Sequence, residues 1–213
     1  RVRLGSLEPD LMTPDAIERF AALDKLCPQF HLSLQSGCGD TLKRMNRRYT
    51  PGEYRGVGDD LREKFPDCGI TTDVMVGFPG EDEREFHGSL EFVKSIGFSR
   101  VHIFAYSPRP GTPAAKASGQ VPGGEKARRS RIMSKECEAS RHSYLDRWIG
   151  RDAEVLIEAR GGDNMLEGYT PQYFPVRFLP AGDGDEFAPG KTVGVHITAQ
   201  KDGVCEGKII TDR

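Results

Sequence analysis

The stretch HLSLQSGCGDTLKRMNRRYT, His31 to Thr50, decides the fold, because it reads as a strand that turns on glycine into a short basic helix. In its strand half, apolar Leu32 and Leu34 alternate with polar Ser33 and Gln35. Successive side chains of a strand point to opposite faces, so one face is apolar and the other can form hydrogen bonds. A parallel strand buried on both faces is normally a near-continuous apolar run. The polar face therefore indicates a crevice that holds a ligand, although an ordinary amphipathic edge strand has the same pattern.

A unit of strand followed by helix is repeated through the first half of the chain. Strands are predicted for residues 1–7, 30–35, 70–76 and 100–106, with helices between them, two of which begin with Thr13-Pro14 and Thr50-Pro51. Repeated units of this kind predict an α/β fold with a parallel sheet, or part of a (βα) barrel. Ligands of such folds bind at the carboxyl ends of the strands. The distinctive residues at or near those ends are Ser6, Glu8, Gln35, Ser36, Asp73, Gly77, Tyr106 and Arg109.

The pattern changes in the second half of the chain. Residues 107–124 are rich in proline and glycine, and loops of this length are commonly functional or mobile. A charged helix is predicted from Glu125 to Trp148, and short apolar runs separated by turn residues follow it at 153–158, 165–170, 173–178, 192–199 and 204–210. Five such strands predict a small barrel of the oligonucleotide-binding (OB) kind. We therefore expect an α/β domain in residues 1–124, a linking helix in 125–147 and an all-β barrel in 148–213.

Composition restricts the class of protein. The net charge of −2 gives no bulk attraction to nucleic acid, so any such site must be local. No run of 18 apolar residues exists, and none of the five cysteines forms a C-x-x-C pair, so neither a membrane span nor a metal site made by this chain is expected. Scattered, unpaired cysteines favour a reduced, cytoplasmic setting.

Three residues of the predicted sheet, at two places, can serve either a ligand or the fold. Gln35 and Ser36 place an amide and a hydroxyl beside glycine, which suits a polar cofactor or a capped turn. Asp73 lies inside an apolar strand, where an unpaired carboxylate is costly, so it needs a ligand or a hydrogen bond from a neighbouring loop.

Basic and aromatic side chains likewise have two readings. Arg47 belongs to a basic cluster that can bind phosphate or carboxylate, or form a solvated helix face. In the predicted small barrel, Tyr169, Tyr173 and Arg177 can stack on and pair with RNA, or serve as core and turn residues.

Four blocks of sequence together resemble a known family. RVRLGSLEP, HLSLQSGCGDTLKRMNRRYT, TTDVMVGFPGE and SPRPGTPAA, in this order and spacing, are similar to the second half of a radical S-adenosylmethionine (SAM) methylthiotransferase barrel. The tail from about Trp148 resembles the C-terminal TRAM domain of that family, a small RNA-binding β-barrel. Gly-Ser-Leu-Glu-Pro and the Glu167–Thr170 stretch look most like the branch that acts on N6-threonylcarbamoyladenosine beside the anticodon of tRNA. Other branches act on isopentenyladenosine in tRNA or on a ribosomal protein.

The resemblance implies a chemistry and a set of partners. In the family, a [4Fe–4S] cluster held by C-x-x-x-C-x-x-C cleaves SAM to generate the radical that activates C2 of the adenine. A second cluster on an N-terminal domain supplies the sulfur. The implied partners are SAM, tRNA, and the N-terminal and first-half barrel domains. The cysteine motif is absent from this chain, so we expect a C-terminal fragment that has no metal ligands or catalytic residues of its own and is inactive alone.

The family's binding positions carry over residue by residue. Ser6 and Glu8 would lie at the SAM ribose, and Gln35 and Ser36 would line the pocket. Arg47 would bind a carboxylate or phosphate, and Asp73 would shape the barrel mouth together with the Gly77–Glu81 turn. Substrate or RNA would be contacted by Arg109, Tyr169, Tyr173 and Arg177. Two rival hypotheses are a tRNA-binding module without chemistry and a radical SAM enzyme with a non-RNA substrate.

Overall fold

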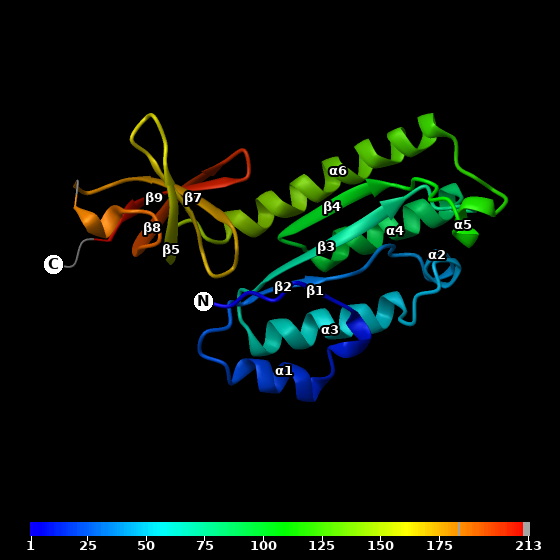
Figure 1. Ribbon diagram of the computed structural model, residues 1–213, viewed down its shortest axis with the longest axis horizontal. Helices are drawn as coiled ribbons and strands as arrows, with labels where there is room; N and C mark the ends of the chain where they lie inside the picture. Colours follow the sequence, from blue (N-terminus) through cyan, green and yellow to red (C-terminus); the bar gives the residue numbers. More distant parts are fainter. Residues whose placement is uncertain (183, 211–213) are drawn as a thin grey trace.

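Residues 1–182 and 184–210 are described by the computed structural model, and its first half is built on a parallel sheet (Figure 1). The sheet has four strands in the order β1-β2-β3-β4. They are β1 (Ser6–Leu7), β2 (Gln29–Leu32), β3 (Gly69–Val76) and β4 (Arg100–Ala105). All neighbouring pairs are parallel, so the carboxyl ends of the four strands meet at one edge of the sheet. This edge is called the carboxyl edge below.

Helices cover one face of the sheet. The helices of the first half are α1 (Pro14–Ala21), α2 (Gly39–Arg44), α3 (Pro51–Lys64), α4 (Glu83–Ile96) and α5 (Pro113–Lys116), with a 3₁₀ turn at Pro9–Leu11. Thr50 and Glu53 form a capping box at the start of α3, and the Thr13 side chain caps α1, so both helices begin where predicted. The apolar side chains of β2 and β3, such as Leu32 and Val74, join the helices in one core, while the alternate side chains lie on the opposite face.

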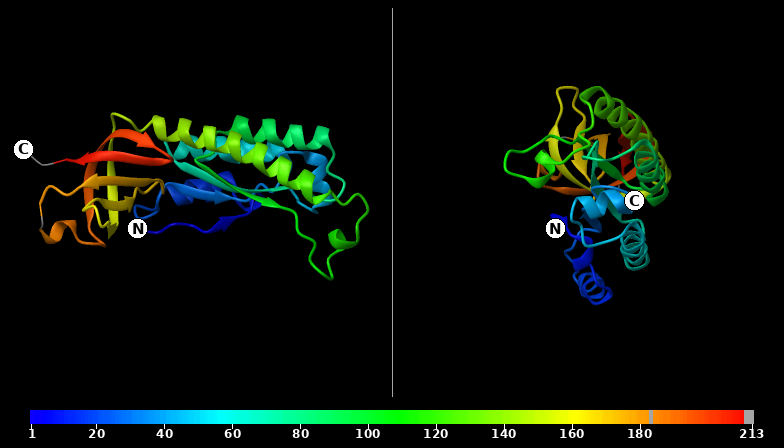
Figure 2. Two further views of the ribbon diagram at one scale, coloured as in Figure 1. Left: turned by 90° about the horizontal axis from the view of Figure 1, so that it is seen from above. Right: turned by 90° about the vertical axis from the view of Figure 1, so that its right-hand side faces the viewer.

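A long helix, α6 (Gly123–Asp146), runs along the sheet to the second domain (Figures 1 and 2). That domain is a closed barrel with the strand order β5-β6-β7-β9-β8, which confirms the predicted small barrel. Its strands are β5 (Asp152–Arg160), β6 (Leu166–Tyr169), β7 (Pro175–Leu179), β8 (Thr192–Lys201) and β9 (Val204–Ile209), with a 3₁₀ turn at Asp185–Phe187. Trp148 and Phe174 are buried in its core.

The small barrel is docked at the amino ends of the strands, opposite the carboxyl edge (Figure 1). The Tyr144 hydroxyl donates to the Asp67 carbonyl over 3.0 Å, and Arg151 forms an ion pair with the Asp67 carboxylate at 2.5 Å. Burial raises the pKa of the Tyr144 phenol, as expected for a side chain enclosed between two packed units. The barrel and the sheet are therefore joined by the partly exposed Arg151–Asp67 ion pair as well as by α6, to which Tyr144 belongs.

Three predicted segments differ most from the structure. The strand expected at residues 1–7 is reduced to β1, because the Val2 backbone instead bridges to Leu26. The strand expected at 30–35 ends at Leu32, because Gln35 has a positive φ of 66°. The loop at 107–124 contains the short helix α5. The predicted second domain ends at residue 213, and residues 211–213 lie outside the described residues.

Along the described part of the chain, no helix combines the length and the apolar character that crossing a membrane requires.

Candidate functional site

Polar side chains of β2 and β3 form a connected group on the face of the sheet that the helices leave uncovered. His31 Nδ1 lies 3.1 Å from the Thr71 hydroxyl, and His31 Nε2 lies 3.6 Å from a carboxylate oxygen of Asp73. Asp73, which needed a partner on sequence grounds, therefore has one in His31. His102 is the β4 partner of Asp73 in the strand register. Burial and the charge of Arg100 hold the pKa of His102 below its usual value.

Glu8 and Arg47 meet at the carboxyl edge. One guanidinium nitrogen of Arg47 donates to both carboxylate oxygens of Glu8, at 3.1 and 3.0 Å. Glu8 follows β1, and Arg47 follows α2 after a residue, Asn46, with a positive φ. The structure thus brings two predicted cofactor residues into direct contact. Both side chains remain partly exposed, so either can exchange this partner for a ligand.

Gln35 has an unusual backbone conformation that its neighbours impose. Its N–H donates to the Asp73 carbonyl and its carbonyl accepts from Met75, both over 2.8 Å. These two bonds hold a non-glycine residue at φ 66°, a conformation enriched at functional sites. The side chain is half-buried at the carboxyl edge, where an amide can reach a polar ligand.

Ser36 is fully buried and bonded within the protein. Its hydroxyl accepts from the Cys38 N–H at 3.2 Å and pairs with the Ser89 hydroxyl of α4 at 3.5 Å. The next residue, Gly37, packs so closely on α4 that a Cβ atom would lie 2.7 Å from that of Phe92. The geometry therefore gives Ser36 a structural contact with α4, and its predicted role in the cofactor pocket remains a prediction.

The turn Gly77–Glu81, which follows β3, is fixed by a buried ion pair. The Gly77 N–H donates to the Glu81 carboxylate over 2.5 Å, and Arg129 of α6 donates to the same oxygen over 2.9 Å. Arg129 also bonds the Glu81 carbonyl and the Glu125 carboxylate. Burial raises the pKa of Glu81, whereas the bonds from Gly77 and Arg129 act in the opposite direction. The turn is therefore a rigid part of the carboxyl edge.

Arg109 lies apart from the other predicted substrate residues. It is exposed in the loop after β4, at the carboxyl edge, where its carbonyl accepts from the Thr112 hydroxyl. No side-chain partner for Arg109 occurs among residues 1–182 and 184–210, so its guanidinium is available for a ligand.

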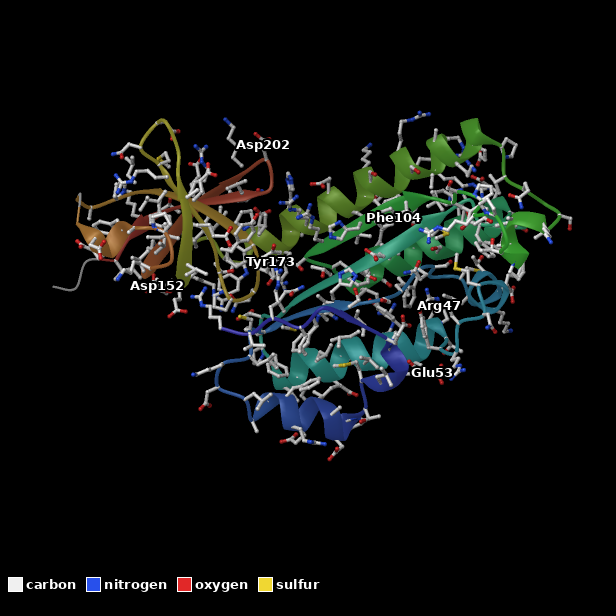
Figure 3. The ribbon with its side chains drawn as sticks, viewed as in Figure 1. Arg47, Glu53, Phe104, Asp152, Tyr173 and Asp202 are labelled. Atoms are coloured by element: carbon white, nitrogen blue, oxygen red, sulfur yellow. The ribbon has the colours of Figure 1, made fainter. Side chains whose placement is uncertain are left out.

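The aromatic residues of the small barrel lie at the opposite end of the sheet. Figure 3 shows Tyr173 beside the barrel and Arg47 beyond the far end of the strands. The Tyr169 and Tyr173 rings stack with centroids 4.7 Å apart, and the Arg3 guanidinium lies 3.4 Å from the Tyr173 centroid. Arg177 forms ion pairs with Asp163 and Glu167. Tyr173 is therefore already stacked on Tyr169 and Arg3, a contact that the sequence did not predict.

The cysteines of the described residues do not meet in a group of three. Cys27, Cys68, Cys137 and Cys205 are buried, and burial raises the pKa of Cys68 to about 11. Within the described ranges, the single group of three potential metal ligands is Cys38, Asp40 and Glu85. Glu85 is already paired with Arg44, and the trio contains one thiol. These residues do not fit the three-thiolate set that a [4Fe–4S] cluster in this setting would need.

Comparisons with known proteins agree with this fold. The model of the radical SAM superfamily matches residues 2–93. The solved structure of coproporphyrinogen III oxidase (HemN) from Escherichia coli, a radical SAM enzyme, superposes with a TM-score of 0.54 at 16% identity over 63% of this chain and 31% of that one. This likeness supports the fold alone.

Curated relatives are more similar in sequence. Threonylcarbamoyladenosine tRNA methylthiotransferase MtaB of Thermotoga maritima is 41% identical over 84% of this chain and 41% of its own length. The tRNA-2-methylthio-N(6)-dimethylallyladenosine synthase of Corynebacterium efficiens is 38% identical over 94% of this chain and 40% of its own. The relative of the same name from Alkaliphilus oremlandii is 37% identical over 100% of this chain and 45% of its own. The chain therefore spans less than half the length of these relatives.

Strands β1, β2 and β3 of the parallel sheet lie in the segment that the radical SAM superfamily model matches, so this part of the chain is similar to a radical SAM domain. Within that superfamily its relatives are methylthiotransferases that act on tRNA. The chain resembles these methylthiotransferases over most of its own length.

Sequence reasoning missed three residues that organise these regions. His31 and His102 lie on neighbouring strands of the sheet, but nothing in the sequence pairs them with Asp73. Arg129, which fixes the Gly77–Glu81 turn, is one of many charged residues in α6 and carries no distinguishing signal.

Proposed function

We propose that this chain is the carboxyl-terminal part of a radical SAM methylthiotransferase that modifies C2 of N6-threonylcarbamoyladenosine in tRNA. The observation that carries the branch is the 41% identity to the Thermotoga maritima threonylcarbamoyladenosine enzyme. In this proposal, residues 1–124 supply one wall of the cofactor barrel, residues 125–147 link the domains, and residues 148–213 form the RNA-binding TRAM barrel.

The carboxyl edge suits SAM by the chemistry of its side chains. Glu8 and Ser6 offer acceptors for ribose hydroxyls, and the Gln35 amide can donate or accept. Arg47 can exchange Glu8 for a ligand carboxylate, which guanidinium binds with two hydrogen bonds. Asp73, steadied by His31, supplies a further acceptor at the barrel mouth. Bound SAM would supply the methyl group and the hydrogen-abstracting chemistry of the family.

The iron–sulfur clusters of the proposed enzyme would be held outside this chain. Four of the five cysteines are buried, and Cys38 is partly exposed. In this proposal the chain binds SAM and substrate, orients them and keeps water from the carboxyl edge, while the missing domains hold both [4Fe–4S] clusters.

RNA contacts are proposed at two places. Arg109 at the carboxyl edge lies where a substrate nucleoside would approach SAM. Tyr169, Tyr173 and Arg177 lie on the small barrel, and their ring stack and ion pairs must rearrange if bases stack on them.

A second candidate substrate is dimethylallyladenosine in tRNA. The relatives with that activity in their names match 94% and 100% of this chain, a wider range than the threonylcarbamoyladenosine enzyme matches. The two candidates share the fold, the cofactors and the class of reaction, and they differ in the side chain on N6 of the adenine.

Calorimetric titration of SAM into this 213-residue chain tests the proposed cofactor edge. We expect binding that weakens about tenfold in Glu8→Gln and in Asp73→Asn, since each change removes a charge-assisted hydrogen bond. Asp152→Asn, on the small barrel, is the matched control and leaves the affinity unchanged. Equal affinity in all variants would place SAM elsewhere.

The substrate is tested in the whole protein after iron–sulfur reconstitution. Mass spectrometry of digested tRNA should show methylthiolation of threonylcarbamoyladenosine, and modification of dimethylallyladenosine alone would favour the second candidate. This chain by itself should form no 5′-deoxyadenosine from SAM, and its formation would overturn the proposed location of the cluster ligands.

A further inference from the structure

A cavity of about 260 Å³ lies where the amino ends of the strands meet the small barrel. It is called the junction cavity here. Its walls come from the first residues of the chain, from β2, β3 and β4, from α6, and from the β6–β7 region of the barrel. The side chains used below are Arg3, His31, Arg100, His102, Arg141 and Tyr173.

The lining of the junction cavity is strongly cationic. It includes three arginines and two histidines and no acidic residue, although the whole chain carries a net charge of −2. In the part of the chain that the structure describes, neither Arg3 nor Arg100 has a carboxylate within ion-pairing distance. Arg141 has only the exposed Glu138, at 3.9 Å. Three arginines therefore line one small cavity whose lining contains no carboxylate.

Two of these guanidinium groups are held in place by their neighbours. Arg3 lies 3.4 Å from the centroid of the Tyr173 ring, whose other stacking partner is Tyr169. Arg141 donates one N–H to the Gly203 carbonyl over 2.8 Å, which leaves its other donors free. Stacking orients a guanidinium without using its N–H groups, so both side chains are preorganised to bind an anion.

The neutral donors around the cavity are partly committed to the protein. Gln29 donates to the Thr71 hydroxyl over 3.0 Å, and Ser99 donates to the Ile70 carbonyl over 3.0 Å. Asp73 is the nearest carboxylate and faces His31 at 3.6 Å, outside the lining. The free donors are therefore mainly the arginines.

We propose that the junction cavity binds a phosphate-type oxyanion through Arg3, Arg100 and Arg141. A phosphate group has several acceptor oxygens to share among three guanidinium groups, whereas a carboxylate has two. The volume is below that of most drug-sized ligand pockets, which suits a single phosphate or its ester. The three arginines are distinct from Glu8 and Arg47 of the carboxyl edge, although Ser6 and His31, the latter paired with Asp73, also border the cavity. The proposed oxyanion site does not depend on the proposed function.

Titration of inorganic phosphate into the 213-residue chain, followed by NMR of the histidine side chains at constant ionic strength, tests the proposal. We expect saturable shifts of the His102 signals and an upward shift of its pKa, because an anion stabilises the charged imidazolium. Arg100→Gln and Arg141→Gln should each weaken binding roughly tenfold. Arg131→Gln, an exposed residue of the same helix as Arg141, is the matched control.

Arg3→Gln protects the test against misfolding, because Arg3 is exposed near the chain terminus and its loss should weaken binding without disturbing the core. Acetate should bind more weakly than phosphate. Non-saturable shifts, equal effects of Arg100→Gln and Arg131→Gln, or equal affinity for acetate would each overturn the proposal. If an RNA stem-loop displaces the phosphate, the natural oxyanion is a backbone phosphate; if it does not, the oxyanion is free phosphate.

Discussion

Replacing Arg129 by methionine removes the guanidinium that holds the Gly77–Glu81 turn. Arg129 and Glu81 have side chains that are 6% and 1% exposed, with their charged atoms 2.9 Å apart. Methionine keeps the unbranched stem of arginine and removes its five donors. The Glu81 carboxylate then remains buried with the Gly77 N–H as its main partner.

The size of the effect follows from this burial. Breaking a buried ion pair by removal of one partner costs about 3–5 kcal/mol, because the remaining charge is left uncompensated. Arg128→Met is the matched control one position away, since its partners Glu83 and Glu125 are partly exposed. Exposed pairs contribute about 0–1 kcal/mol. Arg129→Met should therefore destabilise the chain at least threefold more than Arg128→Met.

Urea unfolding followed by far-UV circular dichroism measures both changes in the free energy of unfolding. In the Arg129→Met variant the pKa of Glu81 rises further, because burial is no longer opposed by the guanidinium. A carboxyl whose folded pKa is raised destabilises the fold as pH rises from its unfolded pKa to its folded pKa. The cost of Arg129→Met should therefore shrink as the pH is lowered toward 4.

The double variant Glu81→Gln with Arg129→Met completes the test. Removal of the charge from Glu81 should recover part of the stability lost in the single variant. The reasoning is refuted if Arg129→Met costs no more than Arg128→Met, or if its cost does not change with pH.

Three further predictions concern other parts of the chain. In urea unfolding, Gly37→Ala should cost about 1–3 kcal/mol, because the new Cβ would lie 2.7–2.8 Å from atoms of α4. Gly56→Ala, in open space on α3, should instead stabilise the fold by about 0.5–1 kcal/mol. Similar values for the two variants would contradict the close packing at Gly37. Cys38 should react with Ellman's reagent at pH 8 well before the four buried cysteines. Burial raises the pKa of three of those four thiols to about 11 or about 12. Simultaneous reaction of all five would contradict this and show that the fold opens. Arg44 lowers the pKa of Glu85, so this ion pair stabilises the fold at pH values above the unfolded carboxyl pKa and loses that effect as pH falls. Arg44→Met should therefore lower the free energy of unfolding by about 2 kcal/mol at pH 7 and by little near pH 2. A decrease that does not depend on pH would exclude the mechanism.

The sequence predicted elements whose cause is local. The helix start at Thr50-Pro51 and the five strands of the small barrel follow from residues that are near neighbours in the chain, and both are present. Alternation also assigned Leu32 and Leu34 to the apolar face of their segment, and both side chains are fully buried in the core. These features depend on the alternation of apolar and polar residues along strands and on hydrogen bonds between residues close in the chain.

Contacts between distant segments were not predictable in the same way. The pairing of Glu8 with Arg47 and the left-handed backbone of Gln35 depend on where β1, α2 and β3 lie in space. The placement of Tyr173 under Arg3, away from the carboxyl edge, depends on how the barrel docks on the sheet. No periodicity in a single sequence encodes how two domains dock. Arg109 and Tyr173 were therefore assigned to one kind of site by their chemistry, although they lie at opposite ends of the sheet.

Helix α6 fixes how the small barrel is placed relative to the carboxyl edge. Its first turns bond the Gly77–Glu81 turn through Arg129, and its last turns place Tyr144 in the core of the barrel. Its 24 residues correspond to about 36 Å at the usual rise per residue. Each residue added or removed would move the barrel by about 1.5 Å and rotate it by about 100° relative to the carboxyl edge. The length of this helix therefore fixes the orientation of the barrel as well as its distance from the carboxyl edge. A change of one residue would alter that orientation more than it would alter the distance.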